Sequence, residues 1–192
     1  KEDINISHIP VILLTARDDR QSQISGYKNG ADGYLSKPFE VEMLMELIRN
    51  RLKNREYTKK RYLNAGLIPT PEESTISLTD ETFLIKLNSI IQENIDNTNL
   101  GIQFICQEVG LGRSSLYNKL KALTGMGANE YISKLRIEKA ITLISGTDMP
   151  FSEIAEKTGF TTPSYFSTAF KQYTGETPSQ YKERKKKGLA DK

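Results

Sequence analysis

The sequence predicts a mainly α-helical fold, in which an all-α domain with two helix-turn-helix units is preceded by a partial α/β unit. The first observation is a pattern of apolar and polar residues that occurs twice in the second half of the chain, which indicates a duplicated unit. The second is an apolar, β-branched run near the start, IPVILL, typical of a strand in a parallel sheet. With 192 residues, the chain has room for two small domains.

The first part of the chain follows the order strand, helix, strand, helix. The run Ile9–Leu14 suits a strand that is buried on both faces of a parallel sheet. A helix over Asp18–Ala31 should end at Gly30, and Gly33–Ser36 should form a second short strand. Glu40–Asn54 has the apolar stripe of an amphipathic helix. This order implies a right-handed parallel unit.

A linker should follow over residues 56–78, which are rich in proline, serine, threonine and glutamate. A helix is then expected from Ser77 or Thr79 to about Asn94, with an apolar inner stripe. At the other end of the chain, Glu183–Lys187 should be a basic tail, with residues 188–192 beyond it.

The stretch Phe151–Tyr181 predicts two short helices around a tight turn. We expect Ser152 to cap the first helix and Gly159 to end it, since glycine adopts the left-handed conformation without steric cost. Pro163 should open the second helix at a first-turn position, where its missing N–H is not needed. Three aromatic side chains of the second helix should point inward at helical spacing: Phe166, Phe170 and Tyr173.

The same pattern occurs earlier, in IQFICQEVGLGRSSLYNKLKALTGMGANEYI, and Ala128–Ser145 should join the two copies as one long helix. A helix of about eighteen residues is roughly 27 Å long. With the offsets of the two recognition helices from this linker helix added, the recognition helices could lie about one DNA turn, ~34 Å, apart. Six positions of the first copy recur in the second at one constant offset: Leu116, Leu120, Lys121, Thr124, Gly125 and Tyr131 match Phe166, Phe170, Lys171, Thr174, Gly175 and Tyr181.

These residues resemble the DNA-binding domain of the AraC/XylS family of bacterial transcription regulators. The resemblance covers about residues 79–187 and is strongest in GFTTPSYFSTAFKQYTGETPSQY. It implies double-stranded DNA as a partner, bound by the polar faces of the two second helices. Ordinary solvated helix faces are the alternative, which the duplicated framework makes less favourable. The polar faces carry Arg113, Ser114, Tyr117, Asn118 and Lys121 in the first copy, and Ser164, Ser167, Thr168 and Lys171 in the second.

The chemistry of these faces suggests different roles for their residues. Asn118 can pair with both hydrogen-bonding groups of an adenine edge, whereas Lys121 and Lys171 suit phosphates. The second face has Thr168 where the family often has arginine, so we expect it to contact bases weakly and phosphates mainly. Gly112 occupies the place of the usual serine cap of the first recognition helix, which should leave that helix start less rigid.

The segments PVILLTA and GADGYLSKPF, followed by an apolar helix, resemble the second half of a response-regulator receiver domain, a flavodoxin-like fold. Residues 1–55 would then hold the response half of a phosphorylation switch. In that resemblance Thr15 is the hydroxyl that follows the phosphoryl group, Lys37 is the cation that pairs with it, Lys37–Pro38 is a cis peptide, and Tyr34 swings inward. A phosphoryl group carries nearly two negative charges, so it needs such a cation and donor.

The family's magnesium-binding and phosphoryl-accepting carboxylates belong to earlier strands, so we expect no cofactor in this chain and no phosphorylation of it by the family mechanism. Lys1 is no natural start, which suggests a piece of a longer protein. The resemblances imply the output part of a two-component phosphorelay, with an upstream sensor kinase or kinase domain as partner. A stand-alone regulator and a hybrid sensor both remain open. The implied location is the cytoplasm, with a membrane tether in the case of a hybrid.

Other functions receive less support from the sequence. The net charge of +3 is compatible with nucleic acid without requiring it. We expect the apolar edge of the first strand to be covered in a homodimer. We expect no membrane contact by this chain. A phosphorelay or scaffold protein whose helix-turn-helix pair binds protein is the alternative function. An enzyme is not expected, because no nucleophile, metal or cofactor constellation is visible, and Cys106 is interpreted as a core residue.

Overall fold

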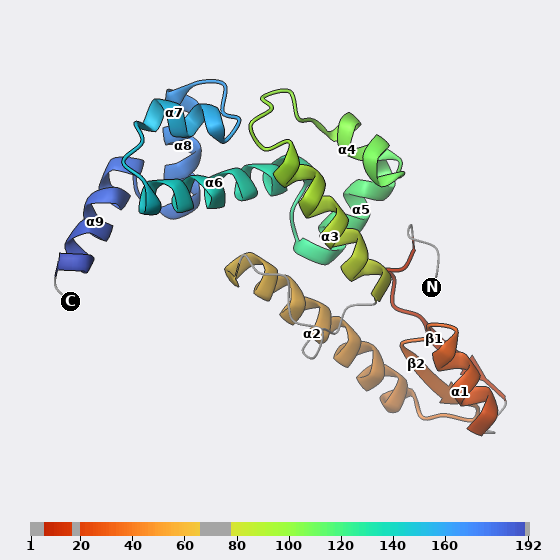
Figure 1. The fold of residues 1–192 in the computed structure, drawn as a ribbon. Helices are drawn as coiled ribbons and strands as arrows, with labels where there is room; N and C mark the ends of the chain where they lie inside the picture. Colours follow the sequence, from red (N-terminus) through yellow and green to blue (C-terminus); the bar gives the residue numbers. More distant parts are fainter. Residues whose placement is uncertain (1–5, 17–19, 66–77, 191–192) are drawn as a thin grey trace. The chain divides into compact units, whose positions relative to one another are not determined.

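The computed structural model describes residues 6–16, 20–65 and 78–190 of the chain (Figure 1). These residues are mainly helical, with one small sheet. They group into two compact units, of which the first comprises Lys1–Lys86 with Leu111–Met126 and the second comprises Leu87–Gly110 with Gly127–Lys192. Within the described residues, no helix is both long enough and apolar enough to cross a membrane.

The sheet consists of two parallel strands, β1 (Ile12–Thr15) and β2 (Gly33–Ser36). Helix α1 (Arg20–Lys28) connects them, which confirms the predicted order of elements and the bounds of the second strand. Ile12 lies opposite Gly33, and Thr15 lies opposite Ser36. The first strand begins at Ile12 rather than at Ile9, because residues 6–9 form a turn in which the Ile9 N–H donates to the Ile6 carbonyl at 2.9 Å.

Two glycines allow helices to approach this sheet closely. A Cβ added at Gly26 of α1 would lie 2.9 Å from the Leu13 side chain and 3.3 Å from the Tyr34 ring. A Cβ added at Gly33 would lie 2.7 Å from the side chain of Leu47, which belongs to the next helix. Since successive side chains of a strand point to opposite faces, α1 and that next helix cover opposite faces of the sheet.

The burial expected for the first strand is wrong for this chain. The side chains of Leu13 and Leu14 are 37% and 42% exposed. Among the described residues β1 pairs only with β2, so the two strands and two helices are too few to cover an apolar strand on every side.

Helix α2 (Val41–Ala65) extends beyond the predicted end at Asn54. Its extension contains good helix formers such as leucine, lysine, arginine and glutamate, and neither glycine nor proline interrupts it before Gly66. The helix therefore takes up residues 56–65, which the composition had suggested as linker. The remainder of the expected linker, residues 66–77, lies outside the described part of the chain.

Helix α3 (Leu78–Glu93) confirms the helix expected there. Its inner stripe is buried as predicted, and it consists of Phe83, Leu84, Leu87, Ile90 and Ile91.

Six further helices complete the described chain and confirm the predicted repeat of short helices around one long helix. They are α4 (Ile102–Val109), α5 (Arg113–Thr124), α6 (Ala128–Gly146), α7 (Phe151–Lys157), α8 (Pro163–Thr174) and α9 (Pro178–Ala190). The predicted turn glycines all have positive φ: 72° at Gly110, 79° at Gly125, 71° at Gly159 and 84° at Gly175. The expected basic tail, Glu183–Lys187, is part of α9.

An aromatic series in the second unit fills the core between α6, α7, α8 and α9. Phe160, Phe166 and Phe170 are buried, and their successive ring centroids lie 5.3 and 5.7 Å apart. Tyr181 of α9 continues the series, 5.6 Å from Phe170. The aliphatic part of this core comprises Ile137, Ala140, Ile144, Ile154 and Ala155.

Three smaller expectations are corrected by the structure. Tyr173 is 43% exposed rather than buried, because its hydroxyl lies 3.4 Å from Glu138 of α6. Partial burial and the Glu138 carboxylate raise the pKa of Tyr173 to about 12. The α7 helix has Pro150 rather than Ser152 at its N-cap, so Ser152 lies inside the first turn. Cys106 is only half-buried, whereas its counterpart Ala155 is buried.

Candidate nucleic-acid interface

The two candidate recognition helices, α5 and α8, begin differently. The N-cap of α8 is Thr162, the residue before Pro163. Its side-chain oxygen accepts a hydrogen bond from the Tyr165 N–H at 3.1 Å. Such a cap stabilises a helix by about 1 kcal/mol. At α5 the N-cap is Gly112, which has no side-chain hydrogen bond to offer. That the start of α5 at Gly112 is less rigid than the start of α8 stays a prediction.

The ends of the two helices are alike. The hydroxyls of Thr124 and Thr174 each donate at 2.8 Å to the backbone carbonyl four residues earlier. Each hydroxyl oxygen then accepts from the N–H two residues later, at 3.1 Å for Thr124 and 3.4 Å for Thr174. Two separate segments therefore make the same hydrogen bonds at matching positions, so the repeat in the sequence is also a repeat in local geometry.

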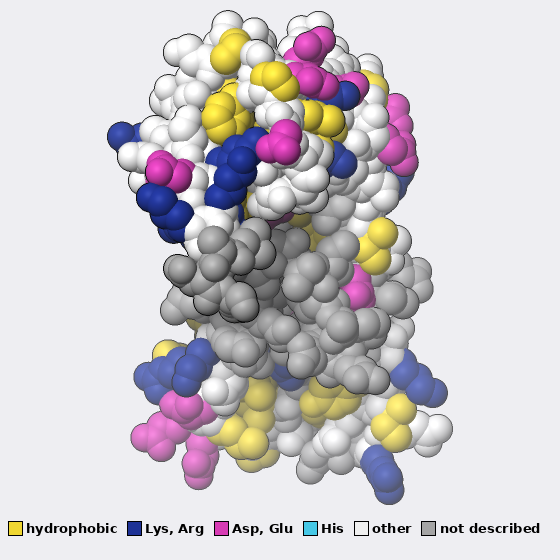
Figure 2. Space-filling view, turned by 60° about the vertical axis from the view of Figure 1, so that its left-hand side comes forward, with side chains coloured by type: hydrophobic (Ala, Val, Ile, Leu, Met, Phe, Trp, Pro, Cys, Tyr) yellow, Lys and Arg dark blue, Asp and Glu magenta, His cyan; other side chains and the backbone are white. Residues whose placement is uncertain are grey.

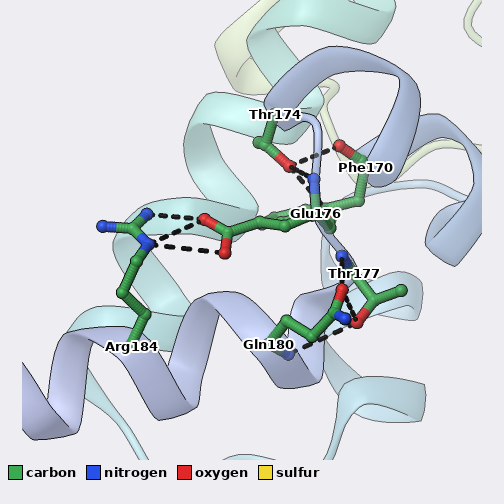
Figure 3. A network of polar contacts seen from close by, with 6 residues as sticks. All are labelled: Phe170, Thr174, Glu176, Thr177, Gln180 and Arg184. Atoms are coloured by element: carbon green, nitrogen blue, oxygen red, sulfur yellow. Dashed lines mark hydrogen bonds and ion pairs between the residues drawn. The ribbon is translucent and has the colours of Figure 1, made fainter.

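The same correspondence continues into the following helices. The Gly127 N–H donates to the Glu130 carboxylate at 3.3 Å, and the Thr177 N–H donates to the Gln180 amide oxygen at 2.9 Å. Figure 3 shows the second of these caps beside the Thr174 hydrogen bonds and the ion pair of Arg184 with Glu176. Each candidate recognition helix is thus followed by a fixed turn and a capped helix.

The predicted face of α5 is accessible along its whole length. Three apolar side chains of the helix are buried instead: Leu116, Leu120 and Leu123. The exposed residues are Arg113, Ser114, Tyr117, Asn118 and Lys121, as the sequence predicts for a helix with one inward face.

The predicted face of α8 is accessible in three of its four residues. Ser164, Thr168 and Lys171 are exposed, and Ser167 is half-buried. The Thr168 hydroxyl donates to the Ser164 carbonyl at 3.1 Å, so it can offer a partner only the lone pairs of its oxygen.

Tyr165 is a candidate contact residue that the sequence analysis missed. It lies in the first turn of α8 and its side chain is 55% exposed. Its ring is held edge-on against Phe160, with centroids 5.8 Å apart. Its position beside Ser164 at the start of the second recognition helix was the signal that could have identified it, because side chains in the first turns of such helices contact base edges.

The lysines of the predicted faces differ in their ion pairing from the bases of α9. Figure 2 shows one face of the molecule, on which basic and acidic side chains lie near one another. Within the described residues Lys121 and Lys171 form no ion pair. By contrast, several bases of α9 are paired with acids: Lys182 with Asp148 at 3.3 Å, Arg184 with Glu176 at 2.6 Å and Lys187 with Glu183 at 3.1 Å.

Two arginines of the second unit illustrate opposite environments. Arg136 of α6 is buried and donates from Nη2 to the Asn97 carbonyl at 2.6 Å, and this burial lowers its pKa. At the surface, the hydrogen bonds to Glu176 raise the pKa of Arg184. Neither guanidinium lies on the predicted faces of α5 and α8. The sequence analysis did not identify Arg136, because it considered the long helix only as the element that joins the two copies.

The predicted switch residues lie at and beside one edge of the sheet. The Lys37 N–H donates to the Thr15 carbonyl at 2.7 Å, directly after the two strands, so the two residues are brought together. The Lys37–Pro38 peptide bond is cis, as the resemblance implied. Tyr34 lies further back along β2, beside Gly26 of α1.

Residues 105–184 match a protein family described as a helix-turn-helix domain. A protein of Formosa agariphila named histidine kinase P4 is 42% identical over 184 residues, which are 96% of this chain and 13% of that protein. The transcriptional regulatory protein YesN of Bacillus subtilis is 33% identical over 121 residues, which are 62% of this chain and 32% of that protein. This chain therefore spans about a third or less of these two curated relatives.

A solved structure is also similar. The C-terminal domain of AraT, a response regulator from Geobacillus stearothermophilus, is 30% identical and has a TM-score of 0.51. The similarity covers 58% of this chain and 88% of the AraT domain.

Proposed function

Because this chain belongs to the family of AraC-type helix-turn-helix proteins, we propose that it binds specific sites in double-stranded DNA and thereby regulates transcription. The observation that carries the proposal is the pair of matching helices, α5 and α8, with the same hydrogen bonds at their ends and polar, accessible outer faces. A solvated surface helix has no need of a second copy in register. The name of YesN, a transcriptional regulatory protein, and the description of AraT as a response regulator support the same class of function.

In this proposal the residues of the two faces contact different parts of the DNA. Asn118 and Tyr117 contact base edges in one major groove, while Lys121 and Lys171 neutralise phosphates. Arg113 and Ser114 complete the first face, and Ser164, Ser167 and Thr168 position the second. Helix α6 has 19 residues and is roughly 28 Å long, which suits one chain that contacts two adjacent major grooves.

We also propose that this DNA-binding part, residues 79–187, is the output of a phosphorelay. Residues 1–55 would be the second half of a receiver domain, joined through residues 56–78, and residues 188–192 would be a tail. Two observations support this: the parallel strand pair and the proximity of Thr15 to Lys37. The similarity to a named histidine kinase over nearly the whole chain supports a kinase, in the same protein or a separate one, as the source of the signal.

Three further features belong to the proposal. The apolar residues exposed on the α/β part, such as Ile9, Val11 and Leu14, would be covered in a homodimer. The magnesium and phosphoryl-acceptor site would lie in receiver strands outside these residues, and the protein would act in the cytoplasm. A scaffold whose helix pair binds protein is the competing function, and DNA binding that depends on both sequence and salt would exclude it.

The phosphate contacts predict a measurable change in salt dependence. A preferred site is first selected from random duplexes, and affinity is then measured against salt for that site and for a scrambled duplex. Lys121→Ala or Lys171→Ala should weaken both complexes alike and reduce the slope of log K against log salt by about one, because each lysine neutralises about one phosphate. Lys28→Ala, an exposed lysine of α1, is the matched control and should leave the slope unchanged.

The base contact predicts a different change in the same assay. Asn118→Ala should cost about 1–3 kcal/mol on the selected site and relax the preference at one base pair, since it removes a bidentate contact without removing a charge. Its salt slope should equal that of the wild type. If the folded lysine and asparagine variants all bound both duplexes as the wild type does, the faces of α5 and α8 would be ordinary solvated surface and DNA binding would be rejected.

A further inference from the structure

A lysine on the inward side of α5 is completely buried. Lys119 is 0% exposed and lies among the buried leucines of the helix, away from Asn118 and Lys121. Its ammonium group forms an ion pair with Asp80 of α3 and a hydrogen bond to the Ser7 hydroxyl. Ser7 donates in turn to the Asp80 carboxylate at 2.6 Å, and the Phe83 ring lies 5.0 Å from the Lys119 nitrogen.

This cluster is not explained by a general need for stability. A buried ion pair must overcome the desolvation of both charges, and its replacement by apolar residues of similar volume is often neutral or stabilising. The best-attested use of such a group in a core is to fix one arrangement among several, as a buried polar residue does for the register of a coiled coil. Leucines alone can pack after a small rotation or shift of a helix, whereas an ion pair with directed hydrogen bonds cannot.

The second helix-turn-helix unit has no buried lysine at the equivalent place. The residue that corresponds to Lys119, at the constant offset of the repeat, is Ala169, which is half-buried. Helix α8 is instead fixed at its start by the Thr162 cap, which α5 lacks at Gly112. The polar contacts of the two recognition helices therefore differ: α8 has a side-chain cap at its start, and α5 has a buried ion pair. The ion pair of α5 lies on the inner side of the helix, and its partners Asp80 and Ser7 come from outside the repeat.

We propose that Ser7, Asp80 and Lys119 fix the rotation of α5 about its axis and thereby set the base preference of the first helix-turn-helix unit. Lys119 is then a positioning residue, because it acts on DNA only through the direction in which Asn118 and Tyr117 point. Ser7 lies in the turn that precedes β1, so the α/β part contributes one of the three groups. The inference rests on the proposed DNA binding.

The decisive variant replaces both charges at once. Asp80→Leu with Lys119→Met keeps apolar volume in the core and leaves no unpaired buried charge, so its melting temperature should equal or exceed that of the wild type. Affinity is measured for the selected site and for single base-pair changes along it. The base pair that responds to Asn118→Ala marks the contact of the first unit.

We expect the double variant to lose discrimination about 5- to 10-fold at base pairs of the first unit. Discrimination elsewhere in the site and the salt slope should remain as in the wild type. Ser7→Ala removes one hydroxyl and should cause a smaller loss at the same base pairs. Glu153→Leu with Lys157→Met, which removes an exposed ion pair of 3.8 Å on α7, is the matched control and should change none of these quantities.

Several outcomes would overturn the inference. One is a folded double variant that discriminates at the first unit as the wild type does. Another is a loss spread equally over the whole site together with a lower melting temperature, since that would show a general structural role. If the double variant fails to fold, unchanged discrimination by Ser7→Ala has the same meaning. Failure of the wild type itself to prefer any duplex is a separate result, which would reject DNA binding and this inference with it.

Discussion

Replacement of Phe170 by alanine is expected to lower the free energy of unfolding by about 3–5 kcal/mol, the usual cost of a truncated buried aromatic residue. The Phe170 side chain is 0% exposed and lies in the middle of the aromatic series of the second unit. Its ring meets Phe166 at 5.7 Å and Tyr181 at 5.6 Å, both edge-on. The truncation would thus leave a cavity bordered by rings from two helices, which rigid aromatic groups cannot fill.

Denaturant unfolding followed by far-ultraviolet circular dichroism measures this effect, since the chain has no tryptophan to report on it. Tyr173→Ala on the same helix is the control, because that side chain is 43% exposed and should cost much less. Equal costs for the two variants would show that the aromatic series does not form the core described here. DNA binding by the Phe170 variant should be lost in proportion to the unfolded fraction.

Local signals in the sequence predicted most of the helical part correctly. Gly110, Gly125, Gly159 and Gly175 end or follow helices with positive φ because few other residues adopt that conformation without strain. The spacing of Phe166 and Phe170 predicted an inward face because a helix repeats every 3.6 residues. For the same reason the exposed faces of α5 and α8 could be predicted, with Ser167, which is half-buried, as the exception.

The errors arose where a partner from elsewhere in the chain decides the outcome. Tyr173 follows the helical period of the core, but Glu138 of α6 attracts its hydroxyl toward the surface. The sequence analysis did not consider Lys119 of α5, whose partner Asp80 lies in α3, two helices earlier. Leu13 and Leu14 have the composition of a central strand, which needs neighbours that the described residues do not provide. Periodicity predicts the direction of a side chain, not the group it meets.

The turn of the second helix-turn-helix unit is more crowded than those at Gly110, Gly125 and Gly175, where an added Cβ would meet nothing within 4 Å. Gly159 has φ of 71°, and a Cβ added there would lie 2.3 Å from the Ile95 carbonyl oxygen and 2.8 Å from Nη2 of Arg136. The carbonyl belongs to the backbone, and Arg136 is itself held by the Asn97 carbonyl and lies over the Phe160 ring at 6.0 Å. None of these groups can move without disturbing a neighbour in the core.

Gly159→Ala should therefore combine two penalties. The left-handed backbone conformation alone costs an alanine about 1–3 kcal/mol, and the clash with Ile95 and Arg136 adds to it. Gly110→Ala is a matched control, because Gly110 has nearly the same φ, 72°, and nothing within 4 Å of its added Cβ. In denaturant unfolding the Gly159 variant should lose clearly more stability than the Gly110 variant, and the difference measures the clash. Similar losses in the two variants would mean that the backbone conformation is the whole cost, and that Arg136 does not hold the turn of the second unit against the loop at Asn97.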